Sequence, residues 1–266
     1  MSARDPGLAF TDGALEFEAW SGNLWDPVGR LLAETAALEP GQSVLDACCG
    51  AGAATFPAAD AVGAAGTVDG VDLSMGLLHL AAAKAARDRR LNVTFTEADV
   101  TRWRSHRTFD AVLCSYSMFF FPEMAAGVEH LVSMLRPGGR FVTSTWVEGA
   151  LEPFAQRILD AAVTERPRLA GVVPEPNRHL AQVDSAAKLG SWLTERGLTE
   201  VSVREEELTL VVDDSMAWTL VMGSGWRTLL PRSPEAIARV RKLFVRSVGP
   251  RVAMNSNTLI GCGKVP

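Results

Sequence analysis

The residues best suited to chemistry cluster where a short apolar strand runs into a glycine turn. Val44 and Leu45 end an apolar run, Gly50 and Gly52 follow, and an alanine-rich segment comes next. This order predicts a strand, a tight turn and a helix. The glycines lack a Cβ, so a ligand can approach the backbone, and the helix N-terminus offers unpaired N–H groups and the positive end of its dipole. We therefore expect the turn to bind a nucleotide-like ligand.

Two aspartates indicate which ligand this is. Asp46 lies at the end of the first strand, where a carboxylate would repel a dinucleotide phosphate but would hold an ammonium group. Asp72 lies 20 residues after Gly52 and ends the next apolar run. A carboxylate at that position can accept hydrogen bonds from both ribose hydroxyls. Together the aspartates predict a nucleoside that carries an amino acid.

Length and composition indicate one domain with a small-molecule substrate. The chain has 266 residues, of which 47% are hydrophobic, enough for a single domain (1–266) with a sizeable core. The formal net charge is −5, and the one short basic cluster, at 87–90, is expected to close a helix. Nucleic acid is therefore not an expected partner. Whether the protein is a monomer or a homodimer is left open.

Cysteine usage and the apolar runs predict a cytoplasmic protein. The four cysteines lie in apolar, strand-like surroundings without Cys-x-x-Cys spacing, which favours buried thiols over disulfides or a zinc site. The first twelve residues have neither the basic start nor the apolar core of a signal peptide. No apolar run reaches the length of a membrane span. The cysteines are Cys48, Cys49, Cys114 and Cys262.

Hydrophobic periodicity predicts alternating strands and helices, hence an α/β fold. The run 109–115 is apolar throughout, as expected of a buried parallel strand. A helical segment (8–38) precedes the first strand, and residues 1–40 are expected either to pack against the sheet or to form part of a lid. The other predicted strands are 43–46, 67–72, 92–97, 140–146, 199–210 and 258–263; the other predicted helices are 53–62, 75–89, 122–135, 153–164, 185–196, 214–222 and 234–248.

Two insertions are expected to cap the substrate site. The first spans 148–182 and contains Pro167, Pro174 and Pro176, so its central part is predicted to be irregular. The second spans 213–250 and joins its two helices through Gly223-Ser224-Gly225. His130 lies within a helix between apolar neighbours, where we expect a packed histidine and not a catalytic group.

Five sequence blocks, in this order and spacing, point to a known family. The chain resembles the class I S-adenosylmethionine (SAM) dependent methyltransferases, in particular the small-molecule branch similar to the ubiquinone and menaquinone biosynthesis enzymes. One departure is that Cys48 replaces the leading glycine of the family's first motif. The blocks are Val44-Leu45-Asp46-Ala47-Cys48-Cys49-Gly50-Ala51-Gly52, Gly70-Val71-Asp72-Leu73-Ser74, Glu97-Ala98-Asp99-Val100, Phe109-Asp110-Ala111-Val112-Leu113 and Leu135-Arg136-Pro137-Gly138-Gly139-Arg140.

The resemblance implies a Rossmann-like sheet of seven strands, mostly parallel with an antiparallel last strand, with helices on both faces and helical lid insertions. It also implies SAM as the cofactor. Met75 would pack on the adenine, Asp99 would accept the adenine amino group, and the Val100 N–H would meet a ring nitrogen. The full set of expected cofactor-binding residues is Asp46, Cys48, Gly50, Gly52, Asp72, Leu73, Ser74, Met75, Asp99, Val100 and Ser115.

Aromatic and methionine side chains predict a fairly hydrophobic methyl acceptor. Three consecutive phenylalanines follow the fourth strand, and at least one should point into a pocket at the ligand-binding edge of the sheet. Ring-containing, polyketide or isoprenoid-like acceptors would fit, with O- or C-methylation. The expected acceptor-binding residues are Trp20, Trp25, Phe119, Phe120, Trp146, Trp218, Met222 and Trp226.

Methyl transfer from a sulfonium is an in-line displacement, so much of the catalysis can come from positioning and from exclusion of water. A hydroxyl or acidic carbon as acceptor would benefit from a general base. The candidates are His179 and Tyr116, with Glu123 and Arg227 as polar groups near the same edge. No metal is expected, because 115–117 offer hydroxyls where metal-dependent relatives would need carboxylates.

Two other classes of protein remain open from the sequence. An NAD(P)-dependent oxidoreductase would share the sheet and the ribose carboxylate. It would favour a glycine or alanine where Thr55 stands, and it would have no use for Asp46. A SAM-binding protein without methyl transfer would share every cofactor residue and would be separated only by its reaction product.

Overall fold

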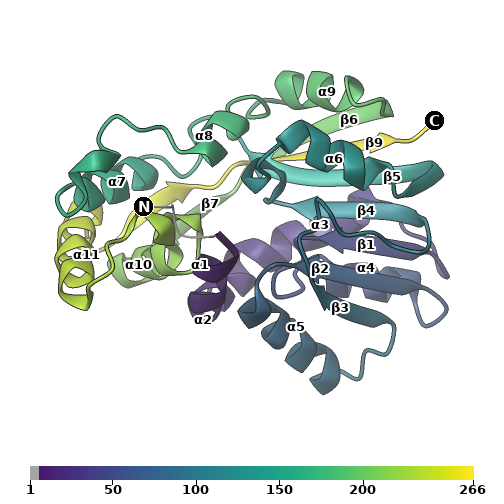
Figure 1. Cartoon of the computed structure of the whole chain (residues 1–266), viewed down its shortest axis with the longest axis horizontal. Helices are drawn as coiled ribbons and strands as arrows, with labels where there is room; N and C mark the ends of the chain where they lie inside the picture. The colour runs from purple at the N-terminus through teal and green to yellow at the C-terminus, as the bar shows by residue number, and fades with distance from the viewer. Residues whose placement is uncertain (1–5) are drawn as a thin grey trace.

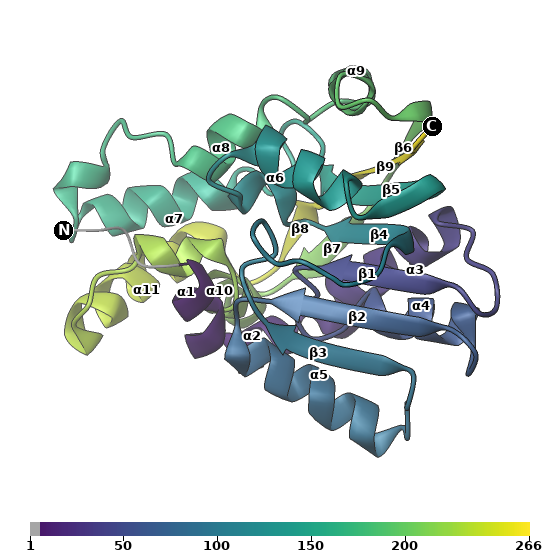
Figure 2. The same cartoon turned by 45° about the vertical axis from the view of Figure 1, so that its right-hand side comes forward.

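The computed structural model describes residues 6–266, and its centre is a seven-stranded sheet of order β3-β2-β1-β4-β5-β9-β6 (Figures 1 and 2). The first five strands pair in parallel, and β9 is antiparallel to both β5 and β6. The sheet predicted from the sequence is confirmed. Its strands are β1 (Ser43–Ala47), β2 (Thr67–Asp72), β3 (Val93–Glu97), β4 (Phe109–Ser115), β5 (Leu135–Trp146), β6 (Thr199–Glu206) and β9 (Thr258–Lys264).

Helices cover both faces of this sheet. The strand order reverses between β1 and β4, and right-handed crossovers then place the helices that follow β1 and β2 on one face and those that follow β4 and β5 on the other. The reversal is also the switch point at which such sheets bind ligands. The flanking helices are α3 (Asp26–Thr35), α4 (Thr55–Val62), α5 (Met75–Arg87), α6 (Met124–Val132) and α9 (Ala186–Thr194).

Three chain segments pack together at the carboxyl end of the sheet, and we call them the cap (Figure 1). In the cap α7 packs on α11, and α10 packs on both α11 and α2. The N-terminal segment contributes α1 (Pro6–Asp12), α2 (Ala14–Glu18) and the π-helical turn η1 (Ser21–Trp25). The others contribute α7 (Phe154–Val163), η3 (Pro167–Leu169), α8 (Glu175–Leu180), α10 (Asp214–Met222), η4 (Gly225–Leu229) and α11 (Pro234–Val248).

Two predictions about local structure were wrong. The predicted strand 199–210 is two strands, because the chain leaves the main sheet after β6, and β7 (Thr209–Val212) pairs with the unpredicted β8 (Val252–Asn255). Leu208, which lies between β6 and β7, accepts the N–H of Ser256 and donates its own N–H to the side chain of Asn257. These partners are almost 50 residues away in sequence, so the local sequence around Leu208 does not predict the break between the two strands. The proline-rich stretch contains α8, which tolerates Pro176 because an N–H at a helix start needs no intrahelical partner.

The remaining elements begin and end within a few residues of their predicted bounds, except β5, which begins at Leu135 and so includes residues 136–139, predicted to end the preceding helix. One example is α5, which begins as predicted after Ser74, whose Oγ accepts the N–H of Leu77 at 3.3 Å. The predicted N-terminal helix is divided into four elements, α1, α2, η1 and α3. A short 3-10 turn, η2 (Met118–Phe120), precedes α6. Within 6–266, no helix is long and apolar enough to cross a membrane.

Candidate active site

The loop after β1 adopts the left-handed backbone that its glycines permit. The φ angles of Cys48, Gly50 and Gly52 are 58°, 53° and 91°. Cys48 therefore holds a conformation that glycine adopts without strain. The loop is tied to the neighbouring strand by the N–H of Cys49, which donates to the carbonyl of Val71 at 3.2 Å. The backbone at this end of β1 is thus both fixed and close to β2.

Asp46 is a buried carboxylate beside this loop. Its side chain is 1% exposed, and its Oδ2 accepts the hydroxyl of Thr55 at 2.5 Å. Burial raises the pKa of Asp46 to about 7, against the opposing effect of the Thr55 hydrogen bond, and the negative charge of Asp72 raises it further. A cation placed next to Asp46 would relieve this cost. The carboxylate is thus suited to a positively charged ligand group.

Asp72 connects the loops that follow β1 and β2. Its Oδ1 accepts the N–H of Ser74 at 2.7 Å, and its Oδ2 accepts the N–H of Gly50 at 2.8 Å. Burial raises its pKa, whereas these two hydrogen bonds lower it. Since Ala47 is opposite Val71, Asp46 and Asp72 lie at the ends of neighbouring strands. A carboxylate accepts about four hydrogen bonds, so Asp72 retains capacity for two more donors.

The other predicted cofactor residues follow the same row of strand ends. Leu73 and Met75 expose 51% and 37% of their surface directly after β2. After β3, Asp99 accepts the N–H and the hydroxyl of Thr101 through Oδ1, at 3.0 and 2.7 Å, and Val100 is buried. Ser115 ends β4, and its Oγ lies 3.1 Å from that of Ser144. The structure therefore brings all the predicted cofactor residues to the carboxyl ends of β1, β2, β3 and β4.

The N-terminal segment covers the glycine loop. A Cβ built on Gly50 would lie 3.5 Å from the Phe17 ring. Beside it, Lys84 of α5 bonds both to Glu18 of α2, at 2.7 Å, and to the carbonyl of Ala51, at 3.2 Å. One ammonium group thus joins the covering segment to the loop. Sequence reasoning missed this pair because 66 residues separate its members.

Aromatic rings form a row from the cap to β5, which we call the aromatic row. Phe120 contacts Phe10, which contacts Phe17, with ring centroids 5.8 and 6.1 Å apart. Phe17 stacks on Trp25 at 4.8 Å. The row continues from Trp25 to Tyr116 at 5.9 Å and from Tyr116 to Trp146 at 4.0 Å, while Phe119 lies 4.9 Å from Phe120. It includes four predicted acceptor residues, Trp25, Phe119, Phe120 and Trp146, and adds Phe10 and Phe17.

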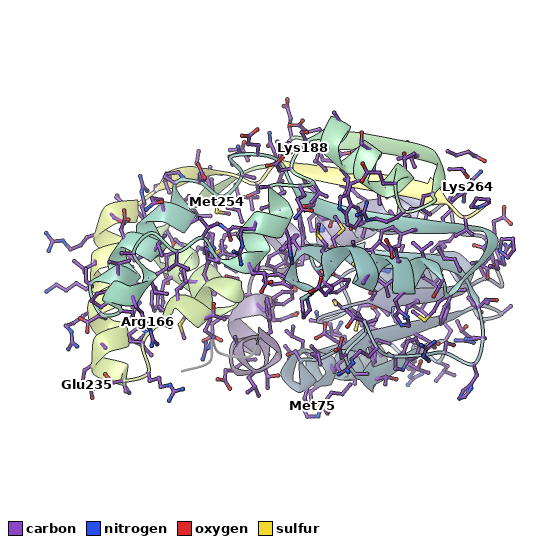
Figure 3. The ribbon with its side chains drawn as sticks, turned by 45° about the horizontal axis from the view of Figure 1, so that its top comes forward. Met75, Arg166, Lys188, Glu235, Met254 and Lys264 are labelled. Carbon is purple, nitrogen blue, oxygen red and sulfur yellow. The ribbon has the colours of Figure 1, made fainter. Side chains whose placement is uncertain are left out.

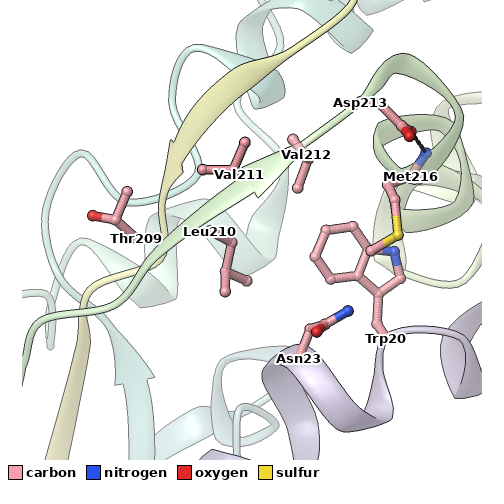
Figure 4. A pocket seen from close by; sticks show the side chains of 8 residues that line it. All are labelled: Trp20, Asn23, Thr209, Leu210, Val211, Val212, Asp213 and Met216. Atoms are coloured by element: carbon pink, nitrogen blue, oxygen red, sulfur yellow. Dashed lines mark hydrogen bonds between the residues drawn. The ribbon is translucent and has the colours of Figure 1, made fainter.

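The remaining predicted acceptor residues lie elsewhere. Trp20 is fully buried and lines a separate pocket of about 390 Å³ between η1 and β7 (Figure 4). Trp218 packs on Phe244 at 6.1 Å, between α10 and α11. Met222 and Trp226 are half-buried in α10 and η4. The structure therefore places Trp20 and Trp218 away from the aromatic row, and their role in acceptor binding stays a prediction.

His179 lies at the carboxyl edge of the sheet, because α8 packs on η2. Its Nδ1 lies 3.1 Å from the carbonyl of Phe119. A carbonyl only accepts, so Nδ1 carries the proton and Nε2 is the basic nitrogen. His130 is packed, as predicted, with Nε2 2.7 Å from the carbonyl of Trp103.

Tyr116 does not have the surroundings of a general base. Its hydroxyl is hydrogen-bonded to Thr258, and burial raises the pKa of the phenol well above its usual value. Its ring is packed within the aromatic row, a placement that favours a structural role, and its role as a base stays a prediction. Across 6–266, no group of three or more His, Cys, Asp or Glu side chains could hold a metal ion.

The strand order and the acidic strand ends define an α/β protein with a nucleotide-type site at the switch point of its sheet. Residues 44–139 match the family model described as a methyltransferase domain. The chain belongs to the class I SAM-dependent methyltransferases. SAM is its cofactor, and the oxidoreductase alternative is set aside.

Relatives and solved structures agree with this assignment. Aklanonic acid methyltransferase DauC of Streptomyces is 32% identical over 55% of this chain and 67% of its own length. Nocamycin O-methyltransferase of Saccharothrix syringae is 29% identical over 88% of this chain and 89% of its own length. A demethylmenaquinone methyltransferase of Lactococcus lactis is 33% identical over 38% of this chain and 41% of its own length.

Among solved structures, Haemonchus contortus phosphoethanolamine N-methyltransferase 2 with S-adenosylhomocysteine has a TM-score of 0.55 at 15% identity, covering 90% of this chain and 52% of that one. At this level of identity, the likeness concerns the fold.

Proposed function

We propose that the enzyme methylates a hydrophobic, ring-containing small molecule, of a polyketide or quinone-like type, at an ionisable hydroxyl or at the carbon of its enol. The observation that carries this proposal is the aromatic row, which runs from beside the glycine loop (Phe17) to the cap (Phe120) and to the end of β5 (Trp146). Stacked and edge-on rings bind flat apolar molecules. The names of three relatives mention aklanonic acid, nocamycin and demethylmenaquinone, and these names support the same class.

The residues at the strand ends fit the cofactor. Asp46 is buried, its pKa is raised, and its charged neighbour is another carboxylate, so an amino acid ammonium would complete its surroundings. Asp72 has acceptor capacity for ribose hydroxyls. In the same assignment Met75 and Asp99 contact the adenine. The bound cofactor supplies an electrophilic methyl group on a sulfonium.

His179 is the proposed general base. Its Nδ1–H is held by the carbonyl of Phe119, which leaves Nε2 as the ring nitrogen that can accept a proton. The acceptor oxygen or carbon would bond to the methyl group as the bond from that group to the cofactor sulfur breaks, which leaves S-adenosylhomocysteine, and the acceptor's proton would pass to Nε2 of His179. The remaining residues position the acceptor and exclude water.

The cap is the proposed lid. Within the described residues of segments 1–40, 148–182 and 213–250, η4 packs on both α1 and α7, and α8 packs on η2, which supports a lid built from these segments. Closure of this cap excludes water from the transfer step, because water would otherwise solvate the nucleophile.

The protein is also proposed to work in a reducing compartment such as the cytoplasm. All four cysteines are free thiols. Burial raises the pKa of Cys114 to about 12, so this thiol stays protonated and unreactive at neutral pH. These features fit a cytoplasmic protein.

Formation of S-adenosylhomocysteine tests the proposal. The purified protein is incubated with SAM and a panel of ring acceptors, namely a naphthalenediol, an anthraquinone phenol and a cyclic β-diketone, with phosphoethanolamine as the polar control. We expect S-adenosylhomocysteine to form with a ring acceptor only, and NMR of the product then separates O- from C-methylation. Turnover of phosphoethanolamine alone would refute the proposed acceptor class.

A further inference from the structure

We propose that the outer face of α11 binds the anionic surface of a lipid bilayer. The contact is peripheral: the helix lies along the lipid headgroups and does not enter the hydrocarbon core. This inference goes beyond the proposed function, because it states where the enzyme meets its acceptor. Only the choice of a membrane as the partner rests on the proposed acceptor class.

Positive charge is concentrated in the segment that contains α11. Residues 232–251 include six arginine and lysine side chains and a single acid, Glu235. The other 246 residues contain 20 basic and 30 acidic side chains, so the rest of the protein is acidic. Such a local excess of one sign indicates a partner of opposite charge. The basic side chains are Arg232, Arg239, Arg241, Lys242, Arg246 and Arg251.

Most of these charges have no acidic partner in the described part of the chain. Arg239 pairs with Glu165 at 2.7 Å, but within 6–266 the other five basic side chains of the segment form no ion pair, and all five are exposed. Elsewhere on the surface, Arg87, Arg107 and Arg136 each pair with an aspartate. The positive charge of the segment is therefore free to meet a partner.

The helix arranges part of this charge as a stripe. Its buried residues recur every fourth position, and it packs on α7 and α10. Arg239, Lys242 and Arg246 follow the spacing i, i+3, i+7 on the side that faces away from this contact. With a rise of 1.5 Å per residue, the stripe is about 10 Å long. The buried residues are Ala236, Val240, Phe244 and Val248.

The stripe lies at one end of the molecule. Figure 3 shows Glu235, at the start of α11, at one end and Lys264 of β9 near the other. Leu243 lies four residues after Arg239 and three before Arg246, and 43% of its surface is exposed. A basic helix with an exposed leucine can bind headgroup phosphates and place the leucine among the upper parts of the lipid chains.

A membrane is favoured over the two other polyanions that a basic face could bind, nucleic acid and an acidic protein. The proposed acceptor is hydrophobic and would partition into lipid, and α11 belongs to the cap that is the proposed lid. The cytoplasmic face of a bilayer is anionic, which matches the proposed compartment. Because the rest of the protein is acidic, anionic lipid would repel it, so binding through α11 also turns the cap toward the bilayer.

Sedimentation of the full chain with lipid vesicles tests the contact. The vesicles contain phosphatidylcholine with one third phosphatidylglycerol, or phosphatidylcholine alone, at about 50 mM salt. The double variant Lys242→Gln/Arg246→Gln removes two charges of the stripe, and the matched control Arg87→Gln/Arg89→Gln removes two exposed charges at the end of α5. We expect the parent and the control to bind only the anionic vesicles. The stripe variant should bind them about twentyfold more weakly, since each basic side chain near such a surface contributes about fivefold.

Each other outcome decides against the contact or against its partner. Failure of the parent to bind anionic vesicles overturns the inference, and so does equal weakening in the control, which would assign the binding to net charge. Tighter binding of a short DNA duplex or of polyglutamate than of the vesicles gives the face to nucleic acid or to an acidic protein and overturns the membrane. Formation of S-adenosylhomocysteine is measured without vesicles, so turnover of a ring acceptor by a protein that binds no vesicles overturns this inference alone.

Discussion

Replacing Asp46 by asparagine should stabilise the free protein at alkaline pH. Burial raises the pKa of Asp46 from 3.8 to about 7, and each pKa unit corresponds to about 1.4 kcal/mol. Ionising this buried carboxyl therefore costs the folded state about 4 kcal/mol. Because the folded pKa is raised, the stabilising contribution is complete below pH 4 and is lost as the pH rises through 7. Asparagine does not titrate, so this loss disappears in the variant.

Thermal unfolding from pH 4 to pH 8 measures this effect. A domain of this size changes its melting temperature by about 2–4 °C per kcal/mol. The Asp46→Asn protein should thus match the parent near pH 4 and melt about 10 °C higher at pH 8. Glu34→Gln, at an exposed position, is the control and should show a constant difference. A constant difference between Asp46→Asn and the parent over the same range would refute the pKa and the reasoning built on it.

The same substitution should weaken cofactor binding while it stabilises the protein. In the proposed site, the ammonium group of SAM neutralises the ionised Asp46, and asparagine removes that charge. At pH 8, S-adenosylhomocysteine should bind Asp46→Asn at least about tenfold more weakly than the parent, since hydrogen bonds to charged groups contribute about 1.5–3 kcal/mol. At pH 5 the parent carboxyl is protonated, so the two affinities should converge. An equal affinity at pH 8 would remove Asp46 from the site.

Three further substitutions test other parts of the site. Lys84→Met removes the ammonium group that joins Glu18 to the carbonyl of Ala51. Because such an ion pair contributes up to about 1 kcal/mol, the dissociation rate of S-adenosylhomocysteine should rise by up to about fivefold. Arg87→Met, on the same helix, is the control and should leave that rate unchanged. His179→Gln should lower kcat about a hundredfold with an unchanged affinity for S-adenosylhomocysteine, whereas exposed His106→Gln should have no effect, and an unimpaired His179→Gln enzyme would exclude the base. Tyr116→Phe should cost about 1 kcal/mol of stability and change kcat by less than about threefold, because Thr258 still donates to the Ser256 carbonyl; a large loss of kcat would restore Tyr116 as a catalytic candidate.

The cofactor half of the molecule could be predicted from local sequence because its signals are local. The turn after β1 needs a left-handed backbone conformation, and Gly50 and Gly52 predict it directly. Asp46 and Asp72 end apolar runs, and parallel pairing brings the ends of neighbouring strands together. Even the departure at Cys48 is accommodated, since its φ of 58° keeps the backbone that glycine would adopt.

The acceptor half could be predicted only by residue type. Trp20, Trp25 and Trp218 were equivalent as apolar aromatic residues in expected lid segments, but their directions depend on how the segments pack. The π-helical turn η1 separates Trp20 from Trp25, and the α10–α11 contact encloses Trp218. Phe10 joins the aromatic row only because α1 lies beside η2 residue Phe120. No short sequence window contains this information.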